Sequence, residues 1–325
     1  WDDAFIMEKK DILPHFDWAI SALQELPEMI KKSDFVLSYD VRVLLTHKQH
    51  IVANSKGKCH YGSVYYNSLF FILSGQRNGI TEETMIRVTG TDILHDFTKE
   101  NLLDFFQKWI SQLDKILDAE PAPSGTMDVV IGAESGGTII HEAVGHGLEA
   151  DLQSSSVYRD KIWQLVAHPS VNVIDDPTLW DLRGFYSVDH EWNIPQKTYL
   201  IKDGILVSYL HNNKTADLFG VEPTWHGRRQ DYSNSLIVRM GSTYLDNGVE
   251  TKESLISRVK DGIYVAQMWG GQVNEVTGDF VFKVGYGYRI RNGELAEPIR
   301  GANIFWNGPE MLKNIQWIAN EIGRA

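Results

Sequence analysis

Residues 136–149, GGTIIHEAVGHGLE, place two histidines five positions apart and a glutamate directly after the first. Histidine is the commonest protein ligand of zinc, and a glutamate beside an activated water molecule is the usual base in metal-assisted hydrolysis. The preceding residues 127–132 are typical of a short buried strand, residues 134–137 of a turn, and the following run of a helix. The candidate metal ligands and base are therefore His141, His146 and Glu142.

The five-residue spacing is unusual for two ligands on one helix. Histidines four positions apart lie about 40° from each other around a helix axis, whereas histidines five apart lie about 140° from each other. A regular α-helix would not readily bring His141 and His146 to one ion. Gly145 precedes the second histidine and would permit a π-type bulge, so we expect a locally widened helix, with no tight packing needed to explain Gly145 and Gly147. The alternative is two ordinary helix histidines.

Several further blocks follow the histidine motif in a fixed order. They are VIDDP at 173–177, GRRQDY at 227–232, GIYV at 262–265, GGQV at 270–273, TGDF at 277–280, PIRGA at 298–302 and NGPE at 307–310. With the HExxxH motif at 141–146 inside a GHGLE run, these blocks resemble the TldD/PmbA family of metallopeptidases. The resemblance is to the TldD-like side, which carries the histidine motif. It covers roughly residue 120 to the end, with a weaker match before that point.

The resemblance implies a peptidase with one zinc ion per chain, His141 and His146 as ligands and Glu142 as general base. It also implies short or unfolded peptides as substrates, and a heterodimer with a motif-lacking family member, or a homodimer. The family's third ligand is a cysteine in a glycine-rich C-terminal segment, but the one cysteine of this sequence is Cys59. We therefore expect that the sequence is truncated at both ends; the alternative is a natural short form with an incomplete site.

The composition favours a two-domain protein of the cytoplasm. A length of 325 residues suggests two domains, and no run of 18 apolar residues or leader-like start predicts a membrane span or signal peptide. The 31 basic and 43 acidic residues give a net charge of −12, which disfavours nucleic-acid and membrane partners. A single cysteine agrees with a reducing compartment.

The pattern along the chain predicts an α+β fold. Apolar spacing predicts helices at 15–32 and at about 98–118, with hairpins across 35–75. The proline-rich residues 121–125 are the best linker, so we expect a mixed α/β N-terminal domain at 1–120. A mainly antiparallel β domain carrying the metal-motif helix is expected at 125–325. Its predicted turns and short helices are Asp203-Gly204, Asn292-Gly293, 254–259 and 309–322.

Other residues are candidates for supporting roles. Glu149 is a possible third ligand, a partner that orients a histidine, or an exposed helix charge. The cluster of His226, Arg228 and Arg229 would bind a substrate carboxylate or form a structural ion pair. Gly270 and Gly271 would let a peptide backbone pair with an exposed strand edge, or mark an ordinary β-bulge.

Two functions compete with a zinc peptidase at this point. The first is a noncatalytic peptide-binding subunit whose metal site is incomplete or vestigial. The second is a metal-dependent hydrolase that acts on another amide-bearing molecule.

Overall fold

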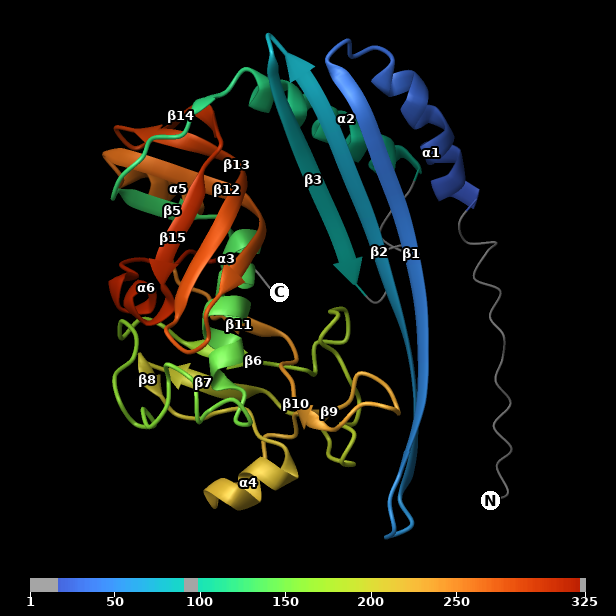
Figure 1. The fold of residues 1–325 in the computed structure, drawn as a ribbon, viewed down its shortest axis with the longest axis vertical. Coiled ribbons are helices and arrows are strands. Elements are labelled where there is room, and N and C mark those ends of the chain that lie inside the picture. The colour runs from blue at the N-terminus through green and yellow to red at the C-terminus, as the bar shows by residue number, and fades with distance from the viewer. Residues whose placement is uncertain (1–16, 91–98, 322–325) are drawn as a thin grey trace.

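The computed structural model describes residues 17–90 and 99–321, which form two parts that lie side by side (Figure 1). The first residue of the predicted helix at about 98–118 and the first two residues of the predicted helix 15–32 lie outside the described residues. None of the helices in residues 17–90 and 99–321 combines the length with the apolar composition that a membrane-spanning helix needs. The fold is α+β, as the sequence predicts.

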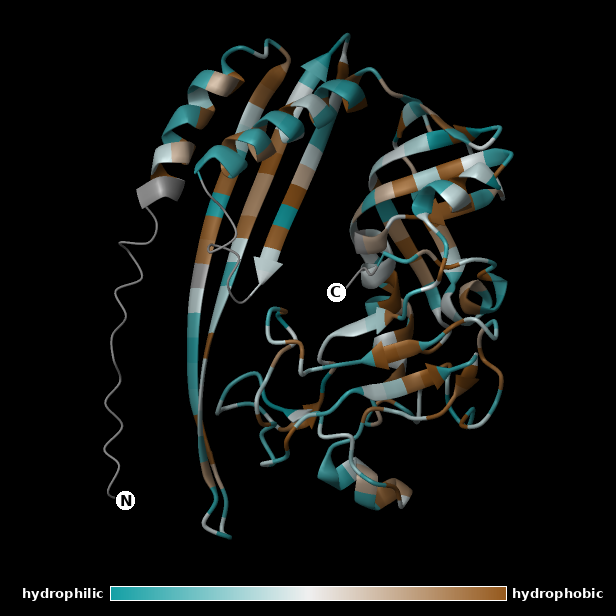
Figure 2. Cartoon of the chain, turned by 180° about the vertical axis from the view of Figure 1, so that it is seen from behind, coloured by the Kyte–Doolittle hydropathy of each residue, from teal (hydrophilic) through white to brown (hydrophobic). Residues whose placement is uncertain are grey.

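The N-terminal part is a three-stranded antiparallel sheet covered by two helices. The strands and helices are β1 (Val36–Ala53), β2 (Cys59–Arg77), β3 (Ile80–Gly90), α1 (Asp17–Ile30) and α2 (Lys99–Leu117). Every second residue of β2 faces the helices, so Leu69, Phe71 and Leu73 are buried against α1 and α2. Hydrophobic residues accordingly concentrate on the strands beside the helices (Figure 2).

The β1–β2 pair extends well beyond this sheet. β3 pairs only with residues 67–77 of β2, so residues 46–53 and 59–66 continue as a two-stranded ribbon. The ribbon runs alongside the C-terminal part (Figure 1) and is attached to it by hydrogen bonds. The Trp192 Nε1–H donates to the carbonyl oxygen of Val52 at 3.0 Å, and His60 Nε2 lies 3.1 Å from Ser187 Oγ.

The C-terminal part contains three sheets. The largest has the order β4-β14-β13-β12-β5, with β15 also paired to β13. Its strands are β4 (Glu120–Pro121), β14 (Glu294–Arg300), β13 (Asp279–Arg291), β12 (Asp261–Val273), β5 (Asp128–Ile131) and β15 (Asn303–Asn307). The four-stranded sheet is β11 (Thr243–Leu245), β6 (Val173–Asp175), β7 (Thr198–Lys202) and β8 (Ile205–Leu206), and the smallest is β10 (Ile237–Val238) with β9 (Gly227–Arg228).

The helices of the C-terminal part are short. They are α3 (Ala133–Ile140), α4 (Asn213–Phe219), α5 (Lys252–Ser257) and α6 (Gly308–Asn314). Helices are present at both predicted positions, 254–259 and 309–322, but the second ends at Asn314 because Ile315 is extended. The predicted turn at 134–137 is wrong, since these residues form the first turn of α3 directly after β5.

The predicted hairpin turns are confirmed by their backbone angles. Asp203-Gly204 and Asn292-Gly293 have positive φ at both positions, and each connects two antiparallel strands. Asn78-Gly79 forms a third such turn, between β2 and β3, that the sequence analysis overlooked.

The two parts have separate hydrophobic clusters. One is formed by residues between 22 and 117, and the main cluster of the C-terminal part by residues between 139 and 312. The predicted linker at 121–125 begins in strand β4, where Glu120 and Pro121 pair with β14. The division into domains at 1–120 and 125–325 stays a prediction.

Candidate metal centre

The histidine motif forms a widened helical turn. After α3, residues His141–Gly145 form a π-helical turn, and residues His146–Leu148 follow as a 3₁₀ turn. The backbone N–H of His146 donates to the carbonyl oxygen of His141, a bond across five residues. The predicted bulge is therefore present, and the backbone through this segment is not a regular α-helix.

The two glycines of this turn serve close packing, which corrects the expectation that no tight packing was needed. Gly145 has ordinary right-handed helical angles, so the turn does not depend on its conformational freedom. A Cβ atom on Gly145 would lie 2.0 Å from Met240 Sδ, and one on Gly147 would lie 2.8 Å from the ring of Tyr158. The missing side chains therefore let Met240 and Tyr158 pack directly against the turn.

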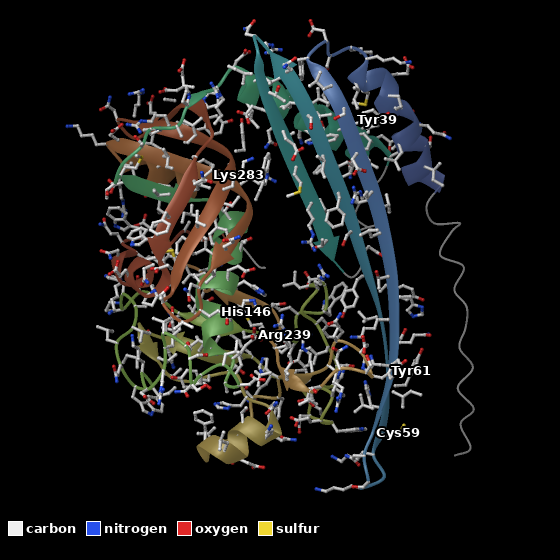
Figure 3. The ribbon with its side chains drawn as sticks, in the orientation of Figure 1. Tyr39, Cys59, Tyr61, His146, Arg239 and Lys283 are labelled. Atoms are coloured by element: carbon white, nitrogen blue, oxygen red, sulfur yellow. The ribbon has the colours of Figure 1, made fainter. Side chains whose placement is uncertain are left out.

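The widened turn gathers three potential ligands. One ligand atom from each of His141, Glu142 and His146 lies within 4.8 Å of the others. The two imidazole rings are nearly perpendicular, with centroids 5.1 Å apart, and Glu142 Oε2 lies 3.8 Å from His146 Nε2. Figure 3 locates His146 and Arg239 in the C-terminal part. In residues 17–90 and 99–321, no other trio of His, Cys, Asp or Glu side chains meets this criterion.

Glu149 is buried beside the second histidine. Its carboxylate oxygen lies 3.1 Å from His146 Nδ1, and its side chain is 3% exposed, so the expectation of an exposed charge is wrong. An ionised carboxylate only accepts hydrogen bonds, so the ring proton of a neutral His146 lies on Nδ1 and leaves Nε2 free. Glu149 Oε1 also accepts a bond from the backbone N–H of Met240 at 3.2 Å. This geometry is that of a carboxylate that orients a metal-binding histidine.

The electrostatic environment differs between the two imidazoles. Burial, and next the neighbouring His146, lower the pKa of His141, which favours its neutral form. The hydrogen bond that His146 donates to Glu149 raises the pKa of His146 despite its burial. The buried Nδ1 of His141 has no hydrogen-bond partner among the described residues. Two imidazoles beside a carboxylate are a donor set that divalent metal ions take in proteins, so the residues of this turn fit such an ion.

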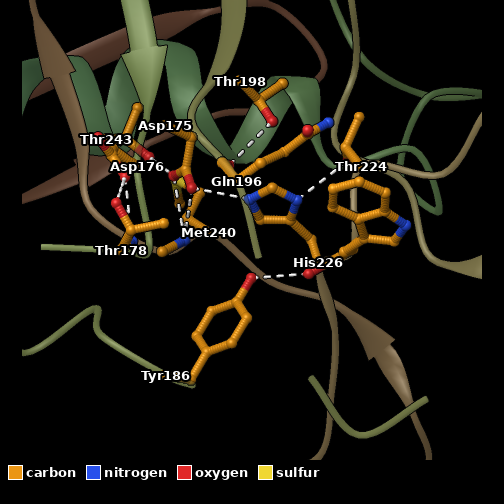
Figure 4. A network of polar contacts seen from close by, with 12 residues as sticks. Asp175, Asp176, Thr178, Tyr186, Gln196, Thr198, Thr224, His226, Met240 and Thr243 are labelled. Carbon is orange, nitrogen blue, oxygen red and sulfur yellow. Dashed lines mark hydrogen bonds and ion pairs between the residues drawn. The ribbon is translucent and has the colours of Figure 1, made fainter. Parts of the chain in front are cut away.

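A buried polar network supports the segment that carries Met240. Asp175 accepts hydrogen bonds from Gly241 N at 3.0 Å and Thr243 Oγ1 at 2.5 Å, and pairs with His226 Nε2 at 2.8 Å (Figure 4). Burial alone would raise the pKa of Asp175, but the partners, with His226 first, lower it on balance. This role of Asp175 was not predicted, although an acidic residue directly after the apolar Val173-Ile174 is a sequence signal for a buried carboxylate.

The predicted cluster at 226–229 separates in the structure. His226 is fully buried and bonded to Asp175 and Thr224, so its placement corrects the expectation of a substrate contact and matches the alternative of a structural ion pair. Arg228 donates to the carbonyl oxygen of Met240 and lies 4.9 Å over the ring of Tyr186. The Arg229 guanidinium donates to the carbonyl oxygen of Asn234.

Gly270 and Gly271 are exposed residues of β12. The register between β12 and β13 shifts between Trp269 and Gly271, so Gly270 is at a β-bulge. β5 pairs only with residues 262–265 of β12, and the Ser135 hydroxyl of α3 donates to the carbonyl oxygen of Ala266 at 3.4 Å. Residues 267–273 of β12 therefore continue beyond the edge occupied by β5, next to the helix that carries the metal motif.

Residues 124–324 match the sequence model of the PmbA/TldA metallopeptidase C-terminal domain. The chain belongs to the PmbA/TldD metallopeptidase family. It is 34% identical over 295 residues to a Haemophilus influenzae protein named metalloprotease TldD homolog, covering 90% of this chain and 58% of that relative. The chain thus spans less than two thirds of that TldD homolog.

Solved structures share the fold of this PmbA/TldD family member. A Thermotoga maritima protein, described as a candidate modulator of DNA gyrase, superposes with a TM-score of 0.82 at 19% identity, covering 94% of this chain and 70% of that one. TldE from Thermococcus kodakarensis superposes with a TM-score of 0.75 at 17% identity, covering 93% and 68%.

Proposed function

We propose that this chain is a zinc-dependent peptidase that hydrolyses short or unfolded peptides. The single observation that carries the proposal is the bond across five residues from His146 to His141, in the turn where ligand atoms of both imidazoles and Glu142 lie within 4.8 Å of one another. Relatives of this chain are named metalloproteases, which supports a metal-dependent peptidase. The histidine nitrogens and the neighbouring carboxylate oxygen favour zinc as the metal.

His141 and His146 would hold the ion, and Glu142 would act as the base. Zinc at this site would supply Lewis acidity to the scissile carbonyl and lower the pKa of a water molecule. The Glu142 side chain is 40% exposed, so its carboxylate is open to substrate. It takes one proton from the attacking water as oxygen bonds to the carbonyl carbon, and delivers that proton to the leaving amine as the C–N bond breaks.

Two neighbouring groups have supporting roles in this proposal. Glu149 holds the Nδ1–H of His146 and so directs Nε2 toward the ion. Arg239 lies 3.7 Å from Glu149, and its side chain is 43% exposed, so its guanidinium is available to the oxyanion that forms during attack.

The substrate would bind as an extended chain. Residues 267–273 of β12 continue past β5 next to α3, and Gly270 has open space where a side chain would be. A peptide paired with this edge would be recognised through its main chain, which predicts a loose sequence preference and a need for unfolded substrates. Arg228 and Arg229 remain candidates for contacts with a substrate carboxylate.

The proposed partner is a family member that lacks the histidine motif, with a homodimer as the alternative. The fold similarity to TldE supports this pairing. A cytoplasmic location is also proposed, because a single, exposed cysteine fits a reducing compartment. The net charge of −12 supports the absence of nucleic-acid or membrane partners.

Hydrolysis of an unstructured peptide by the zinc-loaded chain tests the proposal. The parent chain and Glu253→Gln, a matched change on the exposed helix α5, should cleave the peptide. Glu142→Gln should retain zinc and lose at least about 100-fold in rate, as expected for loss of a general base. Cleavage by Glu142→Gln at the parental rate would refute the assigned base. Peptide binding without cleavage by the parent chain would favour the noncatalytic subunit.

A further inference from the structure

A basic pocket lies between the ribbon and the C-terminal part. It has a volume of about 60 Å³, which provides room for a group of a few non-hydrogen atoms. Its polar and charged lining includes Lys48, His50 and Tyr66 from the N-terminal strands, and His190, Arg228 and Arg229 from the C-terminal part. The pocket therefore depends on both parts of the chain.

Two of its side chains have hydrogen-bonding groups without partners. Both ring nitrogens of His50 and the Nε–H of Arg228 are buried and unpaired within the described part of the chain. His50 crosses over Gly62 on the neighbouring strand, where a Cβ atom would lie 2.2 Å from the imidazole. Gly62 thus provides the space that keeps the His50 ring against the ribbon. Unpaired buried polar groups are costly, and both of these residues also line the pocket.

His190 contributes an N–H donor whose position on the ring is fixed by a backbone contact. Its Nδ1 accepts a hydrogen bond from the backbone N–H of Arg229 at 2.8 Å, so a neutral His190 carries its proton on Nε2. The ring centroids of His190 and His50 are 5.3 Å apart. The ribbon and the C-terminal part therefore bring two imidazoles together at this pocket.

The charge of the pocket contrasts with that of the chain. The chain has a net charge of −12, yet no carboxylate is among the described residues that line this pocket. Burial, and next the nearby Arg228, lower the pKa of Lys48, while the exposed Asp231 acts in the opposite direction. Lys48 also donates to the carbonyl oxygen of Gln230 at 3.2 Å. Cations held close together in this way would be stabilised by an anion.

One residue connects the pocket to the metal centre. Arg228 donates to the carbonyl oxygen of Met240, whose backbone N–H donates to Glu149, the partner of His146. The Met240 side chain also packs on Gly145 of the metal-binding turn. An anion bound by Arg228 would therefore be connected to Glu149, the partner of His146, through the backbone of Met240.

We propose that the basic pocket binds a carboxylate of a peptide substrate and so anchors one part of the peptide near the metal centre. A carboxylate matches the positive charge of a cavity lined by Lys48, Arg228 and Arg229, and the small volume excludes a bulky group. The carboxylate comes from the C-terminus of the peptide or from an acidic side chain. The peptide nature of the ligand rests on the proposed function.

Fluorescence anisotropy with labelled, unstructured peptides tests this anchor. The peptide is made in four forms: with a C-terminal carboxylate, with a C-terminal amide, and as amides that carry one internal Glu or Gln. The Glu142→Gln chain is used throughout, so that the peptides stay intact. The four forms make two pairs, each with a carboxylate form and a neutral form. In one of these pairs, we expect the carboxylate form to bind about tenfold more tightly than the neutral form.

Substitutions in the pocket separate this anchor from general charge. Lys48→Gln and Arg228→Gln should each remove most of the tenfold preference, whereas Lys56→Gln, an equal charge change at the exposed ribbon tip, should preserve it. The preference appearing in the C-terminal pair or in the Glu/Gln pair identifies the source of the carboxylate. Equal affinity for all four peptides, or an unchanged preference in Lys48→Gln, would overturn the inference. Absence of cleavage by the parent chain would instead refute the proposed function. The binding measurement does not depend on cleavage and would still test the carboxylate pocket.

Discussion

The backbone N–H of His146 bonds to the carbonyl oxygen of His141, five residues earlier. A regular helix would instead bond residue 146 to residue 142 and separate the two imidazoles by about 140°. The extra residue in this turn brings the ring centroids to 5.1 Å. The two histidines of the HExxxH motif can thus bind a single ion, because the π-helical backbone brings their side chains together.

Gly145→Ala tests the close contact that supports this turn. Its Cβ atom would lie 2.0 Å from Met240 Sδ, so we expect the free energy of unfolding to fall by about 1–3 kcal/mol, as for other overpacked sites. Gly136→Ala is the matched control on α3, because its Cβ atom would meet nothing within 4 Å; we expect it to stabilise the chain by about 0.5–1 kcal/mol. Urea unfolding measures both, and equal effects would argue against the packing role.

Glu149→Gln tests the orientation of His146. The substitution keeps an acceptor for Met240 N but removes the negative charge beside His146 Nδ1. We expect zinc affinity to fall by about 10–100-fold, the usual effect of losing such a partner. Competition with a zinc chelator measures the affinity, with Glu253→Gln as the control. Undiminished affinity would remove Glu149 from the site.

Asp175→Asn tests the network beneath the Met240 segment. The substitution removes the charged acceptor of Gly241 N and Thr243 Oγ1 and the partner of His226, so we expect a loss of about 3–5 kcal/mol in the free energy of unfolding, because each hydrogen bond to a charged group contributes about 1.5–3 kcal/mol. Thr243→Val removes only one donor to Asp175 and should cost about 1.5–3 kcal/mol. Denaturant unfolding distinguishes the two; similar small effects would show that the Asp175–His226 pair contributes little.

The buried His211 predicts a loss of stability in acid. Burial, and next the charge of His226, lower its pKa to about 4, and its ring contacts those of Tyr209 and Phe219. Between pH 6.5 and 4 the unfolded chain then binds more protons at this position than the folded chain, so stability falls as pH falls through that window. His211→Gln should flatten the profile of unfolding midpoint against pH, whereas the exposed His168→Gln should not. Identical slopes in all three proteins would contradict this account.

Local sequence signals predicted much of this fold and its site. The Asp203-Gly204 and Asn292-Gly293 turns follow from local backbone preference, and the bulge at 141–146 follows from ligand geometry on a helix. Asn78-Gly79 carried the same turn signal and was simply overlooked.

Other features depend on residues far apart in the sequence. The role of Gly145 is set by Met240, which is brought to the turn by the tertiary fold. The basic pocket likewise joins His50 to Arg228 across two parts of the chain, and no local pattern contains that pairing. The short length of α6 reflects an extended Ile315 that apolar periodicity does not reveal.

Zinc content per chain is the decisive measurement, because the proposed function assigns both imidazoles to one ion. After equilibration with zinc and removal of the excess, we expect about one zinc per chain in the parent protein and in Glu142→Gln. We expect loss of that zinc in both His141→Ala and His146→Ala, with their folded state verified by circular dichroism. Full zinc retention in a folded His141→Ala or His146→Ala chain would contradict this assignment.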